Sequence, residues 1–226
     1  MAQKETVERI LDAASVLFAE RGYAETSLRT ITTAAGVNLA SVNYHFGSKK
    51  ALIQAVFARI LDPFCKQLAC NLEELQGNDQ VEVEALFRCL FSTLMQTVAA
   101  KPGLNQAEQV LELQRFMRLL GMAYTQSQGH LRRFIVSQYG DLYRRFLNLL
   151  RETLPGMNPV DFYWQLYFLL GATVFTLSSI DSIQGIIEDN FAEHSGVERA
   201  LELLIPTLTR MMQIPASPAS PEGIAP

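Results

Sequence analysis

A chain of 226 residues, 49% of them hydrophobic, can bury a core without disulfides or structural metals. Its three cysteines, Cys65, Cys70 and Cys89, lie in apolar runs, which is typical of reduced packing residues and argues against a disulfide framework. The net charge of -4 argues against nucleic-acid binding, but it is unevenly spread: residues 1–52 carry six Lys or Arg and five Asp or Glu, and residues 53–226 carry thirteen and eighteen.

The first residues, MAQKETVERILDAA, lack the basic and then apolar pattern of a secretion signal, so we expect a cytoplasmic protein. The longest apolar stretch, residues 162–180, approaches the length of a membrane span. Polar residues such as Gln165 and Thr173 interrupt it, and no basic flank follows. We therefore expect no membrane segment.

Apolar residues at three- and four-residue steps dominate the chain, which predicts an all-α protein of about nine helices. The first helix is expected at residues 5–20 and ends at Gly22. Thr26 is expected to cap a short second helix, Asn38 a third that reaches His45, and Ser48 a long fourth. The first three of these helices predict a domain of residues 1–48.

The later helices are longer, which predicts a second domain of residues 49–214. The fourth helix contains Pro63, which should kink it. Four more helices are then expected, the last of them apolar nearly all round and starting at Asn158-Pro159, before a final helix bent at Pro206. Residues 215–226 are too poor in large apolar groups to fold and should form a disordered tail.

Two short helices joined by a Gly-containing turn match the outline of a helix-turn-helix, whose second helix enters the major groove of DNA. In NLASVNYHF, polar side chains can hydrogen-bond to base edges and small apolar ones can approach thymine methyls, while Val42 and Phe46 face the core. The outline alone also fits surface residues of an ordinary helical hairpin. The candidate DNA-binding residues are Thr26, Ser27, Arg29, Asn38, Leu39, Ala40, Ser41, Asn43, Tyr44, His45 and Lys49.

The residue string resolves that choice. The stretch ILDAASVLFAERGYAETSLRTITTAAGVNLASVNYHFGSKKALI resembles the N-terminal domain of the TetR family of transcription regulators over about residues 7–53. It departs from the family pattern at Thr32, where Ala is usual, and at Asn43, where Tyr is frequent. Because Asn reads adenine with two hydrogen bonds, Asn43 suggests a different base preference.

That resemblance implies a homodimer that binds double-stranded operator DNA as a repressor, and an effector pocket enclosed by the fourth, fifth, sixth and seventh helices. The stretches FMRLLGMAYTQSQGHLRRF and YWQLYFLLGATVF are similar to family members that respond to long-chain fatty acids or their CoA thioesters. The candidate ligand-binding residues are Phe87, Leu90, Phe91, Leu94, Phe116, Leu119, Leu120, Met122 and Phe134, with Arg115, Arg118, Arg132 and Arg133 as candidates for an acidic head group. The same residues also fit a filled core and solvated helix faces.

The resemblance also implies that the last two predicted helices pair with their copies in a dimer. The all-round apolar helix agrees, because it needs more cover than a monomer obviously supplies, although it also fits the central helix of a monomer. The candidate interface residues are Phe168, Phe175, Leu177, Leu201, Leu204 and Leu208.

The sequence contains none of the catalytic or metal-binding motifs that an enzyme hypothesis would need. His45, His130 and His194 are scattered, Cys65 and Cys70 have no partners at zinc-site spacing, and no GxSxG, HExxH, GxxxxGK or GxGxxG string occurs. We therefore expect no catalytic residue, no metal and no cofactor. The remaining alternatives are control by another hydrophobic effector, in efflux or stress regulation, and a helical lipid-carrier protein, which should not bind generic DNA at low salt.

Overall fold

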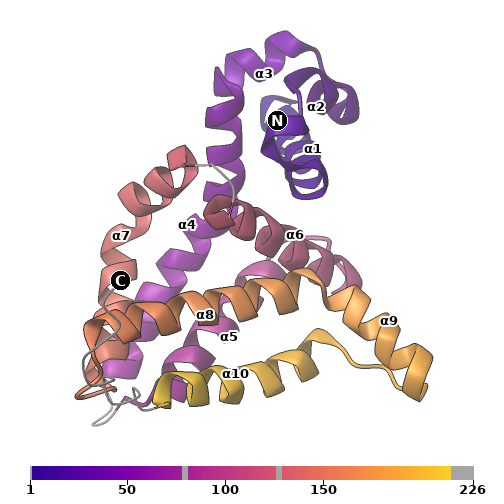
Figure 1. The fold of residues 1–226 in the computed structure, drawn as a ribbon. Coiled ribbons are helices and arrows are strands. Elements are labelled where there is room, and N and C mark those ends of the chain that lie inside the picture. Colours follow the sequence, from indigo (N-terminus) through magenta and orange to yellow (C-terminus); the bar gives the residue numbers. More distant parts are fainter. Residues whose placement is uncertain (1, 78–80, 126–128, 215–226) are drawn as a thin grey trace, which may run out of the picture.

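The computed structural model describes residues 2–77, 81–125 and 129–214. In these residues it contains ten α-helices and no strand, which confirms the all-α prediction (Figure 1). The expected disordered tail, residues 215–226, lies outside the described residues. A small unit of three helices stands at one end of the molecule, and the remaining helices form a larger body beneath it in Figure 1.

The small unit consists of α1 (Ala2–Glu25), α2 (Leu28–Ala35) and α3 (Leu39–Phe46). Gly22 interrupts α1 with a positive φ of 81°, so the predicted break is confirmed although a last turn follows it. Arg9 of α1 donates to the backbone oxygens of Ala35 and Gly36, where the C-terminal end of α2 favours a positive charge. The three helices share a core of fully buried side chains that includes Ile10, Phe18, Ile31 and Val42.

The larger body consists of seven helices. They are α4 (Lys49–Gln76), α5 (Val83–Ala99), α6 (Gln106–Thr125), α7 (Gly129–Glu152), α8 (Pro159–Ser178), α9 (Ile180–Phe191) and α10 (Val197–Gln213). The hydroxyl oxygen of Ser48 accepts from the backbone N–H of Ala51, so Ser48 caps α4 as predicted. Helix α4 is one helix through Pro63, so the proline does not divide it.

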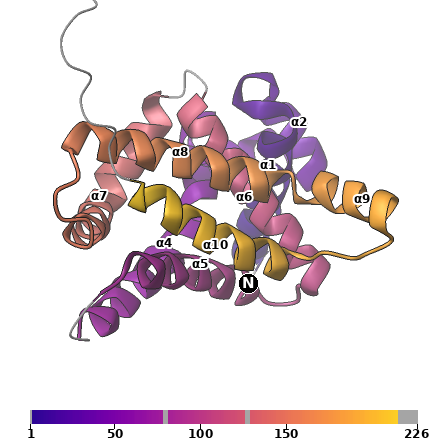
Figure 2. The same ribbon diagram turned by 60° about the horizontal axis from the view of Figure 1, so that its bottom comes forward.

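Helix α4 runs from the small unit into the body and contacts α1, α5 and α7. Helix α6 packs against α1 on one side and α8 on the other, so the small unit has a second neighbour besides α4. Helix α10 contacts both α5 and α8, and Figure 2 shows α8 and α10 running side by side. The body therefore meets the small unit mainly through α4 and α6.

One helix was missed by the sequence analysis, which predicted a single helix over residues 159–180 and nothing before residue 196. Helix α8 ends before Ser179, and α9 follows at an angle of 63° to α8. The break carries neither Gly nor Pro, so no turn signal marks it in the sequence. Helix α9 projects from the body in both views (Figures 1 and 2).

Among the described residues no single helix is long and apolar enough to cross a membrane. Helices α8 and α9 pass by length and composition only when taken together across their bend.

Candidate functional site

The outer face of α3 carries the side chains that the sequence placed in the major groove. Val42 is fully buried and Phe46 half-buried, which confirms that these two residues face the core. The residues Leu39, Ala40, Asn43 and Tyr44 are exposed, Tyr44 by 76% of its surface, and Ser41 and His45 are partly exposed. Asn38 caps α3, because its side-chain oxygen accepts from the backbone N–H and the hydroxyl of Ser41. An exposed row of polar and small side chains on a short, capped helix has the shape that a groove-reading helix needs.

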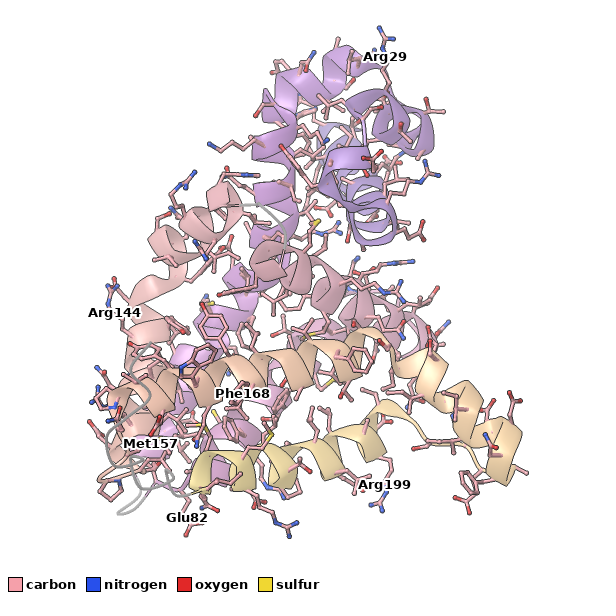
Figure 3. The ribbon with its side chains drawn as sticks, viewed as in Figure 1. Arg29, Glu82, Arg144, Met157, Phe168 and Arg199 are labelled. Atoms are coloured by element: carbon pink, nitrogen blue, oxygen red, sulfur yellow. The ribbon has the colours of Figure 1, made fainter. Side chains whose placement is uncertain are left out.

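The start of α2 differs from the prediction at one residue. Ser27, and not Thr26, is the N-cap, because its hydroxyl oxygen accepts from the backbone N–H of Thr30. Thr26 is fully buried, and its hydroxyl lies 2.8 Å from the backbone oxygen of Gly22 and 3.1 Å from that of Leu17. The assignment of Thr26 to a phosphate contact is therefore wrong. Ser27 and Arg29 are exposed, and Figure 3 shows Arg29 at the end of the small unit, pointing away from the body.

The buried hydroxyl of Thr26 gives a prediction about stability. In Thr26→Val the two backbone oxygens lose their donor while the shape is kept, so the free energy of unfolding should fall by about 1–3 kcal/mol. Chemical denaturation measures it. Thr26→Ser keeps the hydroxyl and is the control. At a temperature where both variants are folded, their DNA affinity should equal the wild type's, and a specific loss in Thr26→Val would contradict the structural role.

Lys49 joins the start of α4 to the end of α1. Its Nζ donates to the backbone oxygen of Ala24 at 3.3 Å and lies 4.3 Å from the centre of the Tyr23 ring, a cation–π contact. Burial lowers the pKa of Lys49, and the nearby Glu25 offsets part of that effect. A phosphate contact by Lys49 therefore has to compete with these contacts inside the small unit.

Contacts from α1 tie the small unit to the body at two places. At its C-terminal end, the backbone N–H of Tyr23 lies 3.2 Å from the sulfur of Met122 on α6, and its ring lies 5.2 Å from the ring of His130 on α7. Farther up α1, Asp12 pairs with Arg59 of α4 at 2.7 Å and with Lys101 at 3.5 Å. A change in the body can therefore reach the small unit through α1 as well as through α4.

The body contains an apolar cavity of about 370 Å³, partly open to solvent, which we call the inner cavity. Helices α4 and α7 supply most of its walls, with single residues from α5, α6 and α8. Its lining is Leu61, Phe64, Cys65, Leu68, Leu90, Tyr124, Arg132, Ile135, Val136, Tyr139, Gly140, Leu142, Tyr143, Phe146 and Tyr167. Its size falls within the range of small-molecule sites, and mostly carbon walls with a few polar groups are typical of such sites.

The polar groups of the inner cavity are tyrosine hydroxyls and one guanidinium. Tyr139 donates its hydroxyl to Asp62 at 2.6 Å, and burial, followed by that hydrogen bond, raises its pKa. Burial raises the pKa of Tyr143 to about 12 and that of the Cys65 thiol to about 11. These groups stay neutral at physiological pH, so Arg132 is the charged group of the lining.

A second cavity, of about 650 Å³, lies between the small unit and the body and is open to solvent; we call it the junction cavity. Helix α1 contributes Phe18, Ala19, Glu20, Arg21 and Gly22, and α6 and α8 supply the remaining walls. Those walls are Arg118, Leu120, Gly121, Met122, Tyr124, Tyr167, Leu170, Gly171, Val174, Phe175 and Ser178. The junction cavity thus combines an apolar floor with two guanidinium groups and one carboxylate.

The two cavities correct the list of predicted ligand residues. Leu90 and Arg132 line the inner cavity, and Arg118, Leu120 and Met122 line the junction cavity. The others line neither. Phe87, Phe91, Leu94, Phe116 and Leu119 are buried core residues, Phe134 packs its ring on Tyr139, Arg115 pairs with Glu112, and Arg133 is an exposed residue of α7. The sequence analysis missed Arg21 and every residue of the α7 wall except Arg132, because the spacing of apolar residues along a helix does not show whether the space that they face is filled.

Half of the predicted interface residues were placed wrongly. Leu177, Leu204 and Leu208 are buried inside one copy of the chain, so they cannot meet a second copy, and Leu201 is half-buried. Phe168 and Phe175 are exposed by 55% and 72%, and Figure 3 shows Phe168 about midway along α8. Val160, Tyr163, Trp164 and Tyr167 on the same helix are also more than half exposed. Helix α8 therefore presents an aromatic face to solvent, larger than single exposed side chains account for.

No metal centre is apparent in the part of the chain that the structure describes, since no three His, Cys, Asp or Glu side chains there are grouped to hold an ion. His194 pairs with Glu188 at 2.7 Å on the exposed end of α9, and His130 lies beside Tyr23. The described site residues therefore belong to two kinds of surface: an exposed helix face and two cavities.

Two family models match separate parts of the chain. The family model described as bacterial regulatory proteins, tetR family, matches residues 10–56, and the model described as tetracyclin repressor-like, C-terminal domain, matches residues 97–210. The HTH-type transcriptional repressor KstR2 of Rhodococcus jostii (strain RHA1) is 42% identical over 53 residues, which are 24% of this chain and 26% of KstR2. The chain thus spans about a quarter of that relative's length.

Solved structures match over nearly the whole chain. A TetR-like transcriptional regulator from Rhodococcus sp. RHA1 has a TM-score of 0.58 at 20% identity and covers 92% of this chain and 96% of its own. The fatty acid degradation regulator FadR from Bacillus halodurans has a TM-score of 0.53 at 19% identity, covering 92% and 94%. Likeness of this degree shows the fold alone. The two family models together carry the assignment, and the chain belongs to the TetR family of bacterial regulatory proteins.

Proposed function

We propose that this protein is a homodimeric repressor that binds a palindromic operator through α3 and is released by a long-chain acyl compound bound in the inner cavity. The observation that carries the DNA part is the exposed row on α3, whose residues are held by a capped helix over a buried core. The observation that carries the effector part is the apolar inner cavity.

The DNA part depends on the outer face of α3. Asn43 is exposed in the middle of this helix, where its amide can make two hydrogen bonds to an adenine edge. Tyr44 follows it and is also exposed. At the start of α2, the exposed side chains of Ser27 and Arg29 can donate hydrogen bonds to phosphate oxygens, and the positive N-terminal end of the helix attracts the same group. The small unit thus offers base-reading and backbone-positioning groups on one side.

Two substitutions on α3 separate these roles. Asn43→Ala should relax the preference at particular base pairs by about 1–3 kcal/mol each, whereas Tyr44→Ala should weaken binding to all sequences alike. Both are measured by selecting sites from a random duplex pool and titrating the selected site and its single-base variants. If both variants lose affinity with unchanged sequence preference, the roles assigned to the α3 face are wrong.

The dimer part depends on the aromatic face of α8. A palindromic site needs two α3 helices about one duplex turn, or roughly 34 Å, apart, which a two-fold symmetric dimer provides. Trp164 and Phe168 stack at 6.1 Å between their ring centres and, with Phe175, lie on one side of α8. A second copy of the chain, related by two-fold symmetry, is the partner that we propose for this face.

The effector part depends on the inner cavity and on a resemblance. Residues 116–134, FMRLLGMAYTQSQGHLRRF, are similar to the fatty-acid-responsive repressor PsrA. Buried methylene groups contribute about 0.8 kcal/mol each, so a chain of 16 to about 18 carbons has ample binding energy in an apolar cavity, and a short chain has little. FadR from Bacillus halodurans, which has a similar fold, is a fatty acid degradation regulator.

Release requires the effector to favour one placement of the small unit over another. Helix α4 is the direct covalent link, because Leu61, Phe64 and Leu68 line the inner cavity and the same helix begins at Ser48 beside α3. Helix α4 is one helix between these points, so a shift of its cavity wall moves its N-terminal end. Extraction of small molecules from the native protein, followed by mass spectrometry, tests whether the cavity holds an acyl chain.

A further inference from the structure

The inner cavity and the junction cavity share two residues, Tyr124 of α6 and Tyr167 of α8. Tyr124 is partly buried and Tyr167 is 56% exposed, and these two aromatic residues lie where the cavities adjoin. A ligand that fills the inner cavity therefore has the junction cavity as its neighbouring space.

The two cavities differ in charge. The inner cavity has mostly carbon walls and Arg132, whereas the junction cavity places Arg21 of α1 and Arg118 of α6 over an apolar floor. Arg118 donates its Nε to the backbone oxygen of Ser178 at 3.2 Å, which holds the guanidinium at the end of α8. Arg21 is exposed and forms no ion pair with the residues that the structure describes. Two guanidinium groups against the single carboxylate of Glu20 favour an anion there.

We propose that the acyl chain lies in the inner cavity and passes between Tyr124 and Tyr167, so that its anionic head binds Arg21 and Arg118 in the junction cavity. This inference rests on the proposed function and adds the place of the head group. Because the two cavities meet at Tyr124 and Tyr167, a chain that extends past these tyrosines brings its head to Arg21 and Arg118. A chain of eight carbons fits inside and leaves its head on the Arg132 side.

The position of the head has a consequence for regulation. Arg21 precedes Gly22, where α1 breaks, and Tyr23 follows with its contacts to Met122, His130 and Lys49. A head bound to Arg21 therefore touches the small unit directly, at the point where it joins α6 and α7. Only an acyl chain long enough to reach the junction cavity brings its head group to Arg21, so the contact with α1 distinguishes long chains from short ones.

Calorimetric titration of the full chain with octanoate, palmitate and palmitoyl-CoA tests this arrangement. Loss of a charged hydrogen bond is worth about 1.5–3 kcal/mol, so Arg21→Glu and Arg21→Gln should weaken palmitate or palmitoyl-CoA by roughly 10- to 100-fold and leave octanoate within about twofold. The matched control is Arg133→Glu, an exposed arginine of α7 that lines neither cavity, and it should leave all three ligands within about twofold of the wild type. Palmitate carries a carboxylate head and palmitoyl-CoA carries the phosphates of CoA. The ligand that binds more tightly therefore identifies the head group that the junction cavity takes.

Four outcomes are distinguishable. A loss confined to the long ligands and to the Arg21 variants supports the inference, and thermal unfolding checks that these variants are folded. An unchanged long-chain affinity in both Arg21 variants overturns it, because the head then stays in the inner cavity, while the proposed function stands. An equal loss in Arg133→Glu also overturns it, because charge alone explains that result. If no acyl compound binds the wild type, the proposed effector is wrong and the inference fails with it.

Discussion

Leu90→Trp should weaken the binding of long acyl chains by about 100-fold without harming DNA binding. Leu90 is partly exposed on α5 and lines the inner cavity, so an indole at this position occupies space that the chain needs. Displacing about four methylene groups removes roughly 3 kcal/mol, or about a 100-fold loss in affinity. Calorimetry with palmitate measures the loss, and DNA affinity without ligand should stay that of the wild type.

The matched control is Leu94→Trp, one turn farther along the same helix. Leu94 is only 6% exposed and lines neither cavity, so the larger side chain overpacks the core and should lower the free energy of unfolding by about 1–3 kcal/mol. Ligand binding by the folded fraction should be kept. If Leu90→Trp binds palmitate normally, or Leu94→Trp blocks it while fully stable, the effector lies elsewhere.

A charge on the aromatic face of α8 should produce a folded monomer. Phe175 is 72% exposed and Leu177 is fully buried two residues later, so the pair separates an interface from a core. Phe175→Glu should dissociate the dimer in sedimentation equilibrium and keep its helical circular dichroism. Leu177→Glu should unfold the chain, because a buried, unpaired carboxylate costs several kcal/mol.

Two results with these variants would contradict the proposed interface on α8. A dimer of Phe175→Glu as tight as the wild type would move the interface away from this part of α8. A folded monomer of Leu177→Glu would mean that Leu177 is exposed at an interface, contrary to its burial. Phe168→Glu, at 55% exposure on the same helix, should behave as Phe175→Glu does.

The fold was largely predictable because capping residues mark most of its helix ends. Asn38, Ser48 and Asn158 each cap the helix that follows, as the sequence indicated. Thr and Ser are both common at helix N-caps, so the sequence does not decide between Thr26 and Ser27. The structure does, because the hydroxyl of Thr26 is used in buried hydrogen bonds to α1. The start of α9 was missed because a bend at Ser179 leaves the apolar pattern uninterrupted.

The candidate sites were less predictable, for one physical reason. Helical periodicity says that Phe91 and Leu90 face inward, but packing against other helices decides that Phe91 fills the core and Leu90 borders a cavity. On α8, apolar on all sides, the pattern could not separate buried Leu177 from exposed Phe175. Arg21 had no signal at all, because its partners α6 and α8 lie far along the chain.

The central claim, that a long acyl chain controls DNA binding, is tested most directly by titrating the protein–DNA complex with acyl compounds of increasing length. The DNA is the duplex that the wild-type protein selects from a random pool, and fluorescence anisotropy reports its release. Oleate-length acids or their CoA thioesters should release the DNA, and octanoyl compounds at the same concentration should not. A complex that ignores every chain length, free or CoA-linked, would contradict the account of the effector.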